Sequence, residues 1–179
     1  MQLLLDAKVS VGLIKGPARD RGLRSERFME DELVAIAPLD TLSDDLSRTE
    51  FVKATLLIRE PGSGSRQVVE MALKKAGFPL SAFKKLATLD STEAIKSAVE
   101  VGHGIGFVSR WAISKELELG TLKIVRVEGV RVTRHFSLIT RTGPEPRGPA
   151  GALRTFALQR ARLLFKAPPG PQLANPSSR

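Results

Sequence analysis

The loop Gly62–Arg66 carries the side chains best suited to binding chemistry in this 179-residue chain. It follows Leu56–Ile58, a continuous apolar run typical of a strand covered on both faces in an α/β sheet. It precedes apolar residues at helical spacing over Val68–Ala76, and Gly77 stands where a C-terminal cap belongs. A loop between a strand and a helix N-terminus directs backbone N–H groups at one point and favours a small anion. An ordinary turn without a ligand explains this segment about as well.

A second turn, Asp90–Thr92, is expected at the same edge of the sheet. A short strand, Leu86–Leu89, comes before it, and a helix over Asp90–Gly102 begins with it. Asp90 is well placed as the N-cap, and Glu93 completes a capping-box pattern. Because both turns lie between a strand and a helix, they should emerge at the edge where open α/β sheets bind ligands.

The two turns together supply groups that suit an anion. Ser63, Ser65 and Thr92 offer hydroxyls, and the guanidinium of Arg66 suits a carboxylate. Plain N-capping explains each hydroxyl taken singly about as well, but their convergence favours a binding site. No general base stands beside them, so binding is favoured over catalysis, and we expect no enzyme activity.

Other chemistries are excluded or disfavoured. The chain has no cysteine, which excludes disulfides, thiolate catalysis and sulfur-dependent metal sites. His103 and His135 show no metal-binding spacing, so we expect no metal and no cofactor. The glycines of Gly102–Gly106 lack the third position of a dinucleotide fingerprint and leave a helix to enter a strand. We therefore expect them to allow close helix–strand packing instead.

The net charge of +9 is concentrated near the C-terminus. Residues 129–179 carry nine basic side chains and one acidic one, Glu145. No aromatic residues interleave them as a base-stacking surface requires, so a solvated basic face is favoured over a nucleic-acid site. No apolar run approaches the roughly 20 residues of a membrane span, and the N-terminus is not a secretory signal. We expect a soluble, cytoplasmic chain with no membrane partner.

The remaining elements predict an α/β fold. Strands and helices alternate after residue 54, which predicts a mostly parallel sheet with helices on both faces. Earlier strands are expected over Val9–Ile14 and Phe28–Ala37, and a later one over Phe136–Arg141. A helix over Ala152–Phe165 should present Leu153, Phe156, Ala157 and Leu164 along one side. The Pro-rich tail should be disordered.

Four segments in register resemble one known family. They are LLLDAKVSVGLIKGP…FMEDELVAIAPLD, LLIREPGSGSRQVVEMALKKAGF, DSTEAIKSAVEVGHGIGFVSRWAI and HFSLITR with its trailing helix. Together they look like the effector-binding domain of LysR-type transcriptional regulators, from about Leu3 to about Leu164. The resemblance implies a periplasmic-binding-protein-like (type II) fold of two α/β lobes, with Glu32–Pro38 and His135–Arg141 as crossover strands.

This resemblance also implies an organisation. Residues 1–38 would be the remnant of lobe I, 39–134 lobe II, 135–166 the crossover strand and return helix to lobe I, and 167–179 a disordered tail. The family's N-terminal winged helix-turn-helix, linker helix and first βα units are not in this sequence, so the first lobe is expected to be incomplete. The bare strand at the beginning of the chain already suggests such a truncation.

The resemblance implies a function and its partners. A small, anionic effector would bind between the lobes to Ser63, Gly64, Ser65 and Arg66, with help from Thr92, and Lys15 and Gly16 would face it from lobe I. Family members form homodimers or homotetramers and bind promoter DNA through the helix-turn-helix. A solute receptor or transport-associated domain of the same fold, with no link to transcription, is the alternative.

Overall fold

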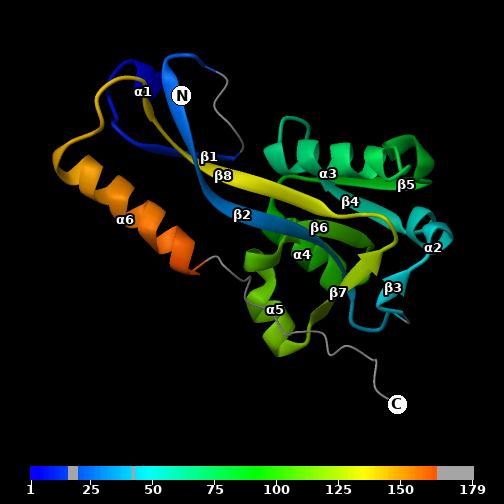
Figure 1. Ribbon diagram of the computed structural model, residues 1–179. Helices are drawn as coiled ribbons and strands as arrows, with labels where there is room; N and C mark the ends of the chain where they lie inside the picture. Colours follow the sequence, from blue (N-terminus) through cyan, green and yellow to red (C-terminus); the bar gives the residue numbers. More distant parts are fainter. Residues whose placement is uncertain (16–19, 42, 165–179) are drawn as a thin grey trace.

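One long strand, β2 (Leu23–Pro38), organises the sheet of the computed structural model, which describes residues 1–15, 20–41 and 43–164. The main path of the eight-stranded sheet is β1 (Gly12–Lys15), β8 (Val132–Arg141), β2, β6 (Ile105–Ser109), β4 (Thr55–Arg59) and β5 (Lys85–Leu89). Off this path, β7 (Leu122–Val127) pairs with β2 and with β3 (Asp45–Leu46). Figure 1 shows β2 and β8 running together across the molecule.

Among the described residues, six helices and two 3₁₀ turns connect or flank these strands along the chain. They are α1 (Gln2–Leu5), α2 (Arg48–Lys53), α3 (Gly64–Lys75), α4 (Thr92–Glu100), α5 (Ser114–Leu119) and α6 (Gly148–Leu164), with 3₁₀ turns at Leu80–Ala82 and Arg110–Ile113. The alternation expected after residue 54 is therefore confirmed.

The expectation of a mostly parallel sheet is wrong. The strands β4, β5 and β6 are parallel, as is the β3–β7 pair. The pairs β1–β8, β2–β6, β2–β7 and β2–β8 are antiparallel. Local alternation predicts the parallel part, because each crossover there carries a helix. The antiparallel part depends on β2 and β8, which meet from distant parts of the sequence.

Helices cover both faces of the sheet, as predicted. On one face, Val69 and Leu73 of α3 join a cluster of buried residues that includes Leu56. On the other face, Ile95 and Val99 of α4 belong to a separate buried cluster that includes Leu57. These two clusters form the larger part of the molecule.

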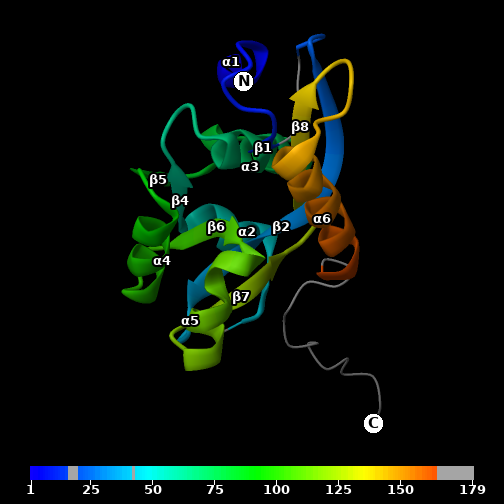
Figure 2. The same cartoon turned by 90° about the vertical axis from the view of Figure 1, so that its left-hand side faces the viewer.

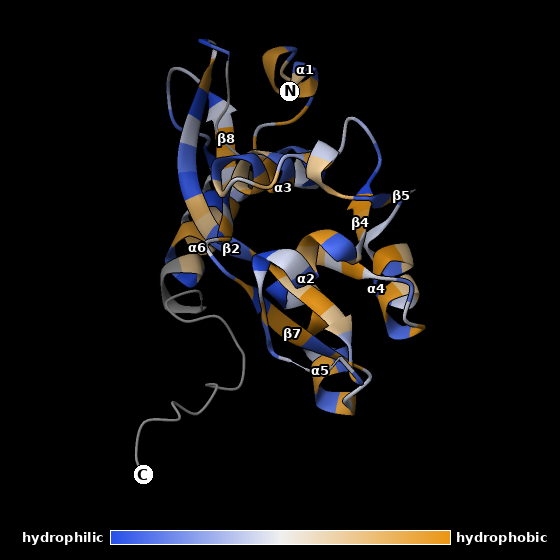
Figure 3. Ribbon diagram, turned by 90° about the vertical axis from the view of Figure 1, so that its right-hand side faces the viewer, coloured by the Kyte–Doolittle hydropathy of each residue, from blue (hydrophilic) through white to orange (hydrophobic). Residues whose placement is uncertain are grey.

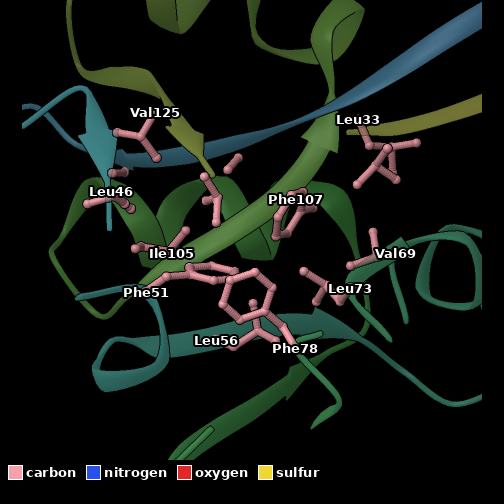
Figure 4. Close-up of a cluster of buried hydrophobic side chains, with 14 of the residues drawn as sticks. Leu33, Leu46, Phe51, Leu56, Val69, Leu73, Phe78, Ile105, Phe107 and Val125 are labelled. Carbon is pink, nitrogen blue, oxygen red and sulfur yellow. The ribbon is translucent and has the colours of Figure 1, made fainter. Parts of the chain in front are cut away.

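The larger cluster contains a group of phenylalanine rings. The ring of Phe51 on α2 is fully buried and meets those of Phe78, Phe83 and Phe107 edge to face, with centroids 5.3, 5.0 and 6.2 Å away. Figure 4 shows Phe51 and Phe78 side by side beneath β6, with Leu56 below them. This packing fixes α2 against the sheet, and such ring pairs add to the stability that burial provides.

The two halves of β2 differ. Val34–Ala37 is buried within the larger clusters, whereas much of the first half is exposed and, as Figure 3 shows, hydrophilic. That first half pairs with β8 and leads to a small cluster of Leu4, Leu23 and Ile139. The second half of β2 thus packs within the two larger clusters. The predicted division of the chain into lobes, with a boundary at residue 38, stays a prediction.

The last helix packs differently from its predicted stripe. Leu153 and Phe156 are 57% and 58% exposed. Instead, α6 lies along the first half of β2 (Figures 1 and 2). There the Arg154 guanidinium pairs with the Glu26 carboxylate. The predicted helix is confirmed, and the side of it that carries Leu153 and Phe156 faces solvent, whereas Arg154 contacts β2. The predicted disordered tail, 167–179, lies outside the described residues.

Helix caps and glycines position the turns that matter for function. Ser63 caps α3, and Gly77 ends that helix with φ of +83°, as predicted. The expected N-cap of α4, Asp90, is wrong: Ser91 is extended and its hydroxyl accepts from the Ala94 N–H at 3.0 Å. The close packing expected of Gly102–Gly106 is confirmed, because a Cβ at Gly106 would collide with the Ile95 side chain. Within the described ranges, no helix combines the length and apolar character needed to cross a bilayer.

Removing the central ring tests this core. Phe51→Ala should lower the free energy of unfolding by about 3–5 kcal/mol, since it leaves a cavity among three rings. Phe156→Ala on the exposed face of α6 is the matched control and should change it by less than about 0.5 kcal/mol. Urea unfolding followed by circular dichroism measures both. Equal losses for the two variants would contradict the core described here.

Candidate anion-binding site

A buried ion pair joins the two long strands beside α3. Asp31 on β2 and Arg134 on β8 are direct partners in the antiparallel register. The Arg134 Nε and Nη2 atoms lie 2.7 and 2.6 Å from Asp31 Oδ2, and the two residues are only 9% and 1% exposed. The Ser109 hydroxyl of β6 donates to Asp31 Oδ1 at 2.7 Å. The carboxylate is thus held by groups from two neighbouring strands.

The same guanidinium reaches the first turn of α3. Arg134 Nη1 donates to Ser65 Oγ at 2.7 Å, and Ser65 is 8% exposed. The Ser65 hydroxyl therefore accepts from a cation, and its own proton points away from that cation. A candidate site residue from the sequence is in this way connected to the strand pair β2–β8.

The N-terminus of α3 is open in front of this contact. Ser63 accepts from the Arg66 N–H at 3.5 Å and so acts as the N-cap. A Cβ built on Gly64 would meet nothing within 4 Å, so ligand atoms can approach the backbone there. The first N–H groups of a twelve-residue helix carry a partial positive charge. The local geometry suits an anion near Gly64.

Arg59, at the end of β4, brings the two predicted turns together. Its Nη1 atom lies 3.4 Å from Thr92 Oγ1, and its backbone carbonyl accepts from Arg66 Nη1 at 3.0 Å. Arg59 is also paired with Glu60, and Arg66 with Glu70. The Arg66 guanidinium, which was expected to bind a ligand carboxylate, thus already contacts Glu70 and the Arg59 carbonyl within the protein.

Lys15 adds positive charge from β1. It pairs with Phe136 in the β1–β8 register, so its side chain lies on the face of the sheet that also carries Arg134. Burial lowers the pKa of Lys15 below its ordinary value, and repulsion from Arg134 and Arg59 lowers it further, against a smaller opposing effect of Asp31. Lys15 therefore feels an excess of positive charge that an anion would relieve. The other predicted lobe I residue, Gly16, lies outside the described residues.

The described residues form a surface rather than an enclosed pocket. The cavity beside Ser65 and Arg66 measures only about 10 Å³, whereas ligand pockets span about 300–1,000 Å³. A larger groove of about 590 Å³ lies between α3 and β8, but none of the predicted site residues lines it. Within the described ranges, no group of three or more histidine or acidic side chains could hold a metal ion.

The structure thus assembles most of the predicted residues. One turn contains Ser63, Gly64, Ser65 and Arg66. Arg59 connects Thr92 to this turn through its contacts with Thr92 and Arg66. The charges of Arg59 and Arg134 repel that of Lys15. Their role in binding remains a prediction. Sequence reasoning missed Arg59, Asp31 and Arg134. Arg59 directly ends the apolar run of β4 and could have been noticed there, but the other two are recognisable only from the β2–β8 register.

Comparison with known proteins places this geometry in a family. Residues 1–162 match the family model described as the LysR substrate binding domain. The helix-turn-helix-type transcriptional regulator YeiE of Escherichia coli K12 is 38% identical over 136 residues, which cover 75% of this chain and 45% of YeiE. This chain therefore matches about half the length of that curated relative.

Solved structures show the same fold. The regulatory domain of CcmR from Synechocystis PCC6803, in complex with 2-PG, aligns with a TM-score of 0.75 and 19% identity over 91% of this chain and 78% of its own. The effector-binding domain of QuiR, in complex with shikimate, aligns with a TM-score of 0.72 and 16% identity over 92% of this chain and 77% of its own.

The charge at Lys15 gives a test that needs no ligand. Its lowered pKa means that the folded chain binds fewer protons than the unfolded chain between that value and about 10.5, so stability should rise with pH across this window. Arg59→Gln should raise the Lys15 pKa, because a repelling cation is removed. NMR titration of the Lys15 side chain measures this. An unchanged pKa in the variant would place Arg59 too far from Lys15 to matter.

Proposed function

The chain belongs to the LysR substrate-binding domain family, and we propose that it binds a small anionic effector at the N-terminus of α3. The mixed α/β fold of this family, of the type II periplasmic-binding-protein kind, confirms the fold class expected from the sequence. A transcription-regulatory role, rather than an enzymatic one, follows for the family and its named relatives.

The observation that carries the proposal is the convergence of positive groups on one helix N-terminus. Lys15, Arg59 and Arg134 come from three different strands, and Ser65 and Gly64 from the helix itself. Burial lowers the pKa of Lys15, and the nearby guanidinium groups of Arg134 and Arg59 lower it further. A ligand carboxylate or other oxyanion would lower this repulsion and accept from the free N–H groups of α3.

The small size of the local cavity supports a two-walled site. We propose that the α3 turn forms one wall of an interlobe cleft, and that Lys15 and Gly16 belong to the opposite wall. The CcmR and QuiR domains were solved in complex with small molecules, 2-PG and shikimate respectively. Those ligands belong to those proteins, but they support a small molecule as the ligand class here.

The parent protein would use this binding to regulate transcription in the cytoplasm. We propose that a helix-turn-helix elsewhere in that protein contacts promoter DNA, as the name of YeiE suggests for its relative. A homodimer or homotetramer would carry the effector signal to the DNA. These partners are proposed for the whole parent protein, because the segment that matches this chain makes up only 45% of YeiE.

Titration of the chain with small carboxylates, phosphate and sulfate by calorimetry tests the site. Ser65→Ala should weaken binding of the best ligand about tenfold, since a hydrogen bond to a charged group is worth about 1.5–3 kcal/mol. Arg66→Ala should weaken it through loss of order in the turn. Ser81→Ala, an exposed hydroxyl after the far end of α3, is the matched control and should bind as the unmodified chain does. Identical affinities for all three variants would reject the site.

A further inference from the structure

Arg134 occupies a position that effector binding alone does not require. Its guanidinium donates from Nε and Nη2 to the Asp31 carboxylate and from Nη1 to the Ser65 hydroxyl, and the side chain is 8% exposed. The ring of Phe136 lies 5.2 Å away, on the same face of β8. Because Asp31 and Ser65 occupy these donors, Arg134 adds to the electrostatic field of the proposed site but is not itself placed to bind the ligand directly.

Stability alone also explains this arrangement poorly. Replacing a buried ion pair by apolar side chains of similar volume is often neutral or stabilising. What an apolar pair cannot do is fix the direction of a neighbouring hydroxyl. Because Ser65 Oγ accepts from Arg134, the Ser65 proton is directed elsewhere, and the hydroxyl can act toward a ligand only as a donor or through its remaining lone pair.

The guanidinium is planar and rigid, which makes it a mechanical link as well as a hydrogen-bond donor. Its contacts bridge β8 to β2 through Asp31 and to α3 through Ser65. Asp31 is in turn held by Ser109 on β6. A shift of the first turn of α3 must therefore either break the 2.7 Å bond to Ser65 or tilt the plane that holds Asp31.

We propose that Arg134 is a positioning residue that orients the Ser65 hydroxyl and couples the N-terminus of α3 to the strand pair β2–β8. The strands it couples are those that join the small cluster around Leu4 to the larger clusters. Occupation of the α3 turn is thereby transmitted to the segment that connects the two parts of the molecule. The identity of the ligand rests on the proposed function, whereas the coupling is a property of the ligand-free chain.

Hydrogen exchange of the full ligand-free chain tests the coupling. Ser65→Ala should raise exchange of the β2 and β8 amides around Asp31 and Arg134 about tenfold, because one anchor of the guanidinium is lost. Ser63→Ala is the matched control: it removes a hydroxyl from the same turn, but one that holds only the Arg66 N–H, so exchange should rise in α3 alone. Ser65→Thr keeps a hydroxyl and should restore protection in both strands. Equal effects of the two alanine variants on β2 and β8 would overturn the proposal.

A double-variant cycle with inorganic phosphate as the probe adds a readout that loss of stability does not imitate. Ser65→Ala and Arg134→Lys should each weaken phosphate binding about tenfold, and the double variant no further, because lysine cannot hold Asp31 and Ser65 together. Fully additive effects would overturn the orienting role. If the unmodified chain binds neither phosphate nor the other anions tested, the proposed function fails at this site, while the exchange experiment still decides the coupling.

Discussion

Asp31 and Arg134 face each other across β2 and β8 at the point where the two strands meet the remainder of the sheet. One side of this pair is tied to β6 by Ser109, and the other to α3 by Ser65. Because the pair is buried, removal of either partner is destabilising, since it leaves an uncompensated charge in a region of low dielectric. This one electrostatic contact thus links the strand pair, the parallel strands and the binding turn, in addition to the backbone pairing of β2 with β6 and β8.

The positive charge around the site has a structural origin. Arg59 and Arg66 are paired with the adjacent acids Glu60 and Glu70, and Arg134 with Asp31. Each guanidinium is therefore held in place by its acidic partner. Because these side chains are already ordered, a ligand would meet a preorganised electrostatic field. Lys15 has no such close acidic partner among the contacts of the described residues, and its pKa is lowered first by burial and then by repulsion from Arg134 and Arg59. A preorganised field of this kind suits recognition of a small anion.

Much of the fold could be predicted from the sequence where local physics decides it. The run at Leu56–Ile58, the cap at Ser63 and the terminating Gly77 specify β4 and α3 through short-range interactions, and both were predicted correctly. The antiparallel pairing of β2 with β8 joins residues about a hundred positions apart, which no local pattern encodes. The inward face of α6 could not be predicted for the same reason, since Arg154 on that face contacts the distant Glu26.

The candidate site divides along the same line. The hydroxyls of the α3 and α4 turns follow from strand–turn–helix order, so the sequence places them at one edge of the sheet. Arg134 and Asp31 become neighbours only through the register of β2 with β8, which no local sequence pattern indicates.

The most direct test of the anion site is a chemical-shift map of the chain titrated with phosphate at constant ionic strength. An anion bound at the N-terminus of α3 should give saturable shifts that cluster at the amides of Gly64 and Ser65 and at the side chain of Lys15. Shifts that cluster instead along the groove between α3 and β8, which Lys75 and Arg131 help to line, or that never saturate, would contradict an anion site at this turn.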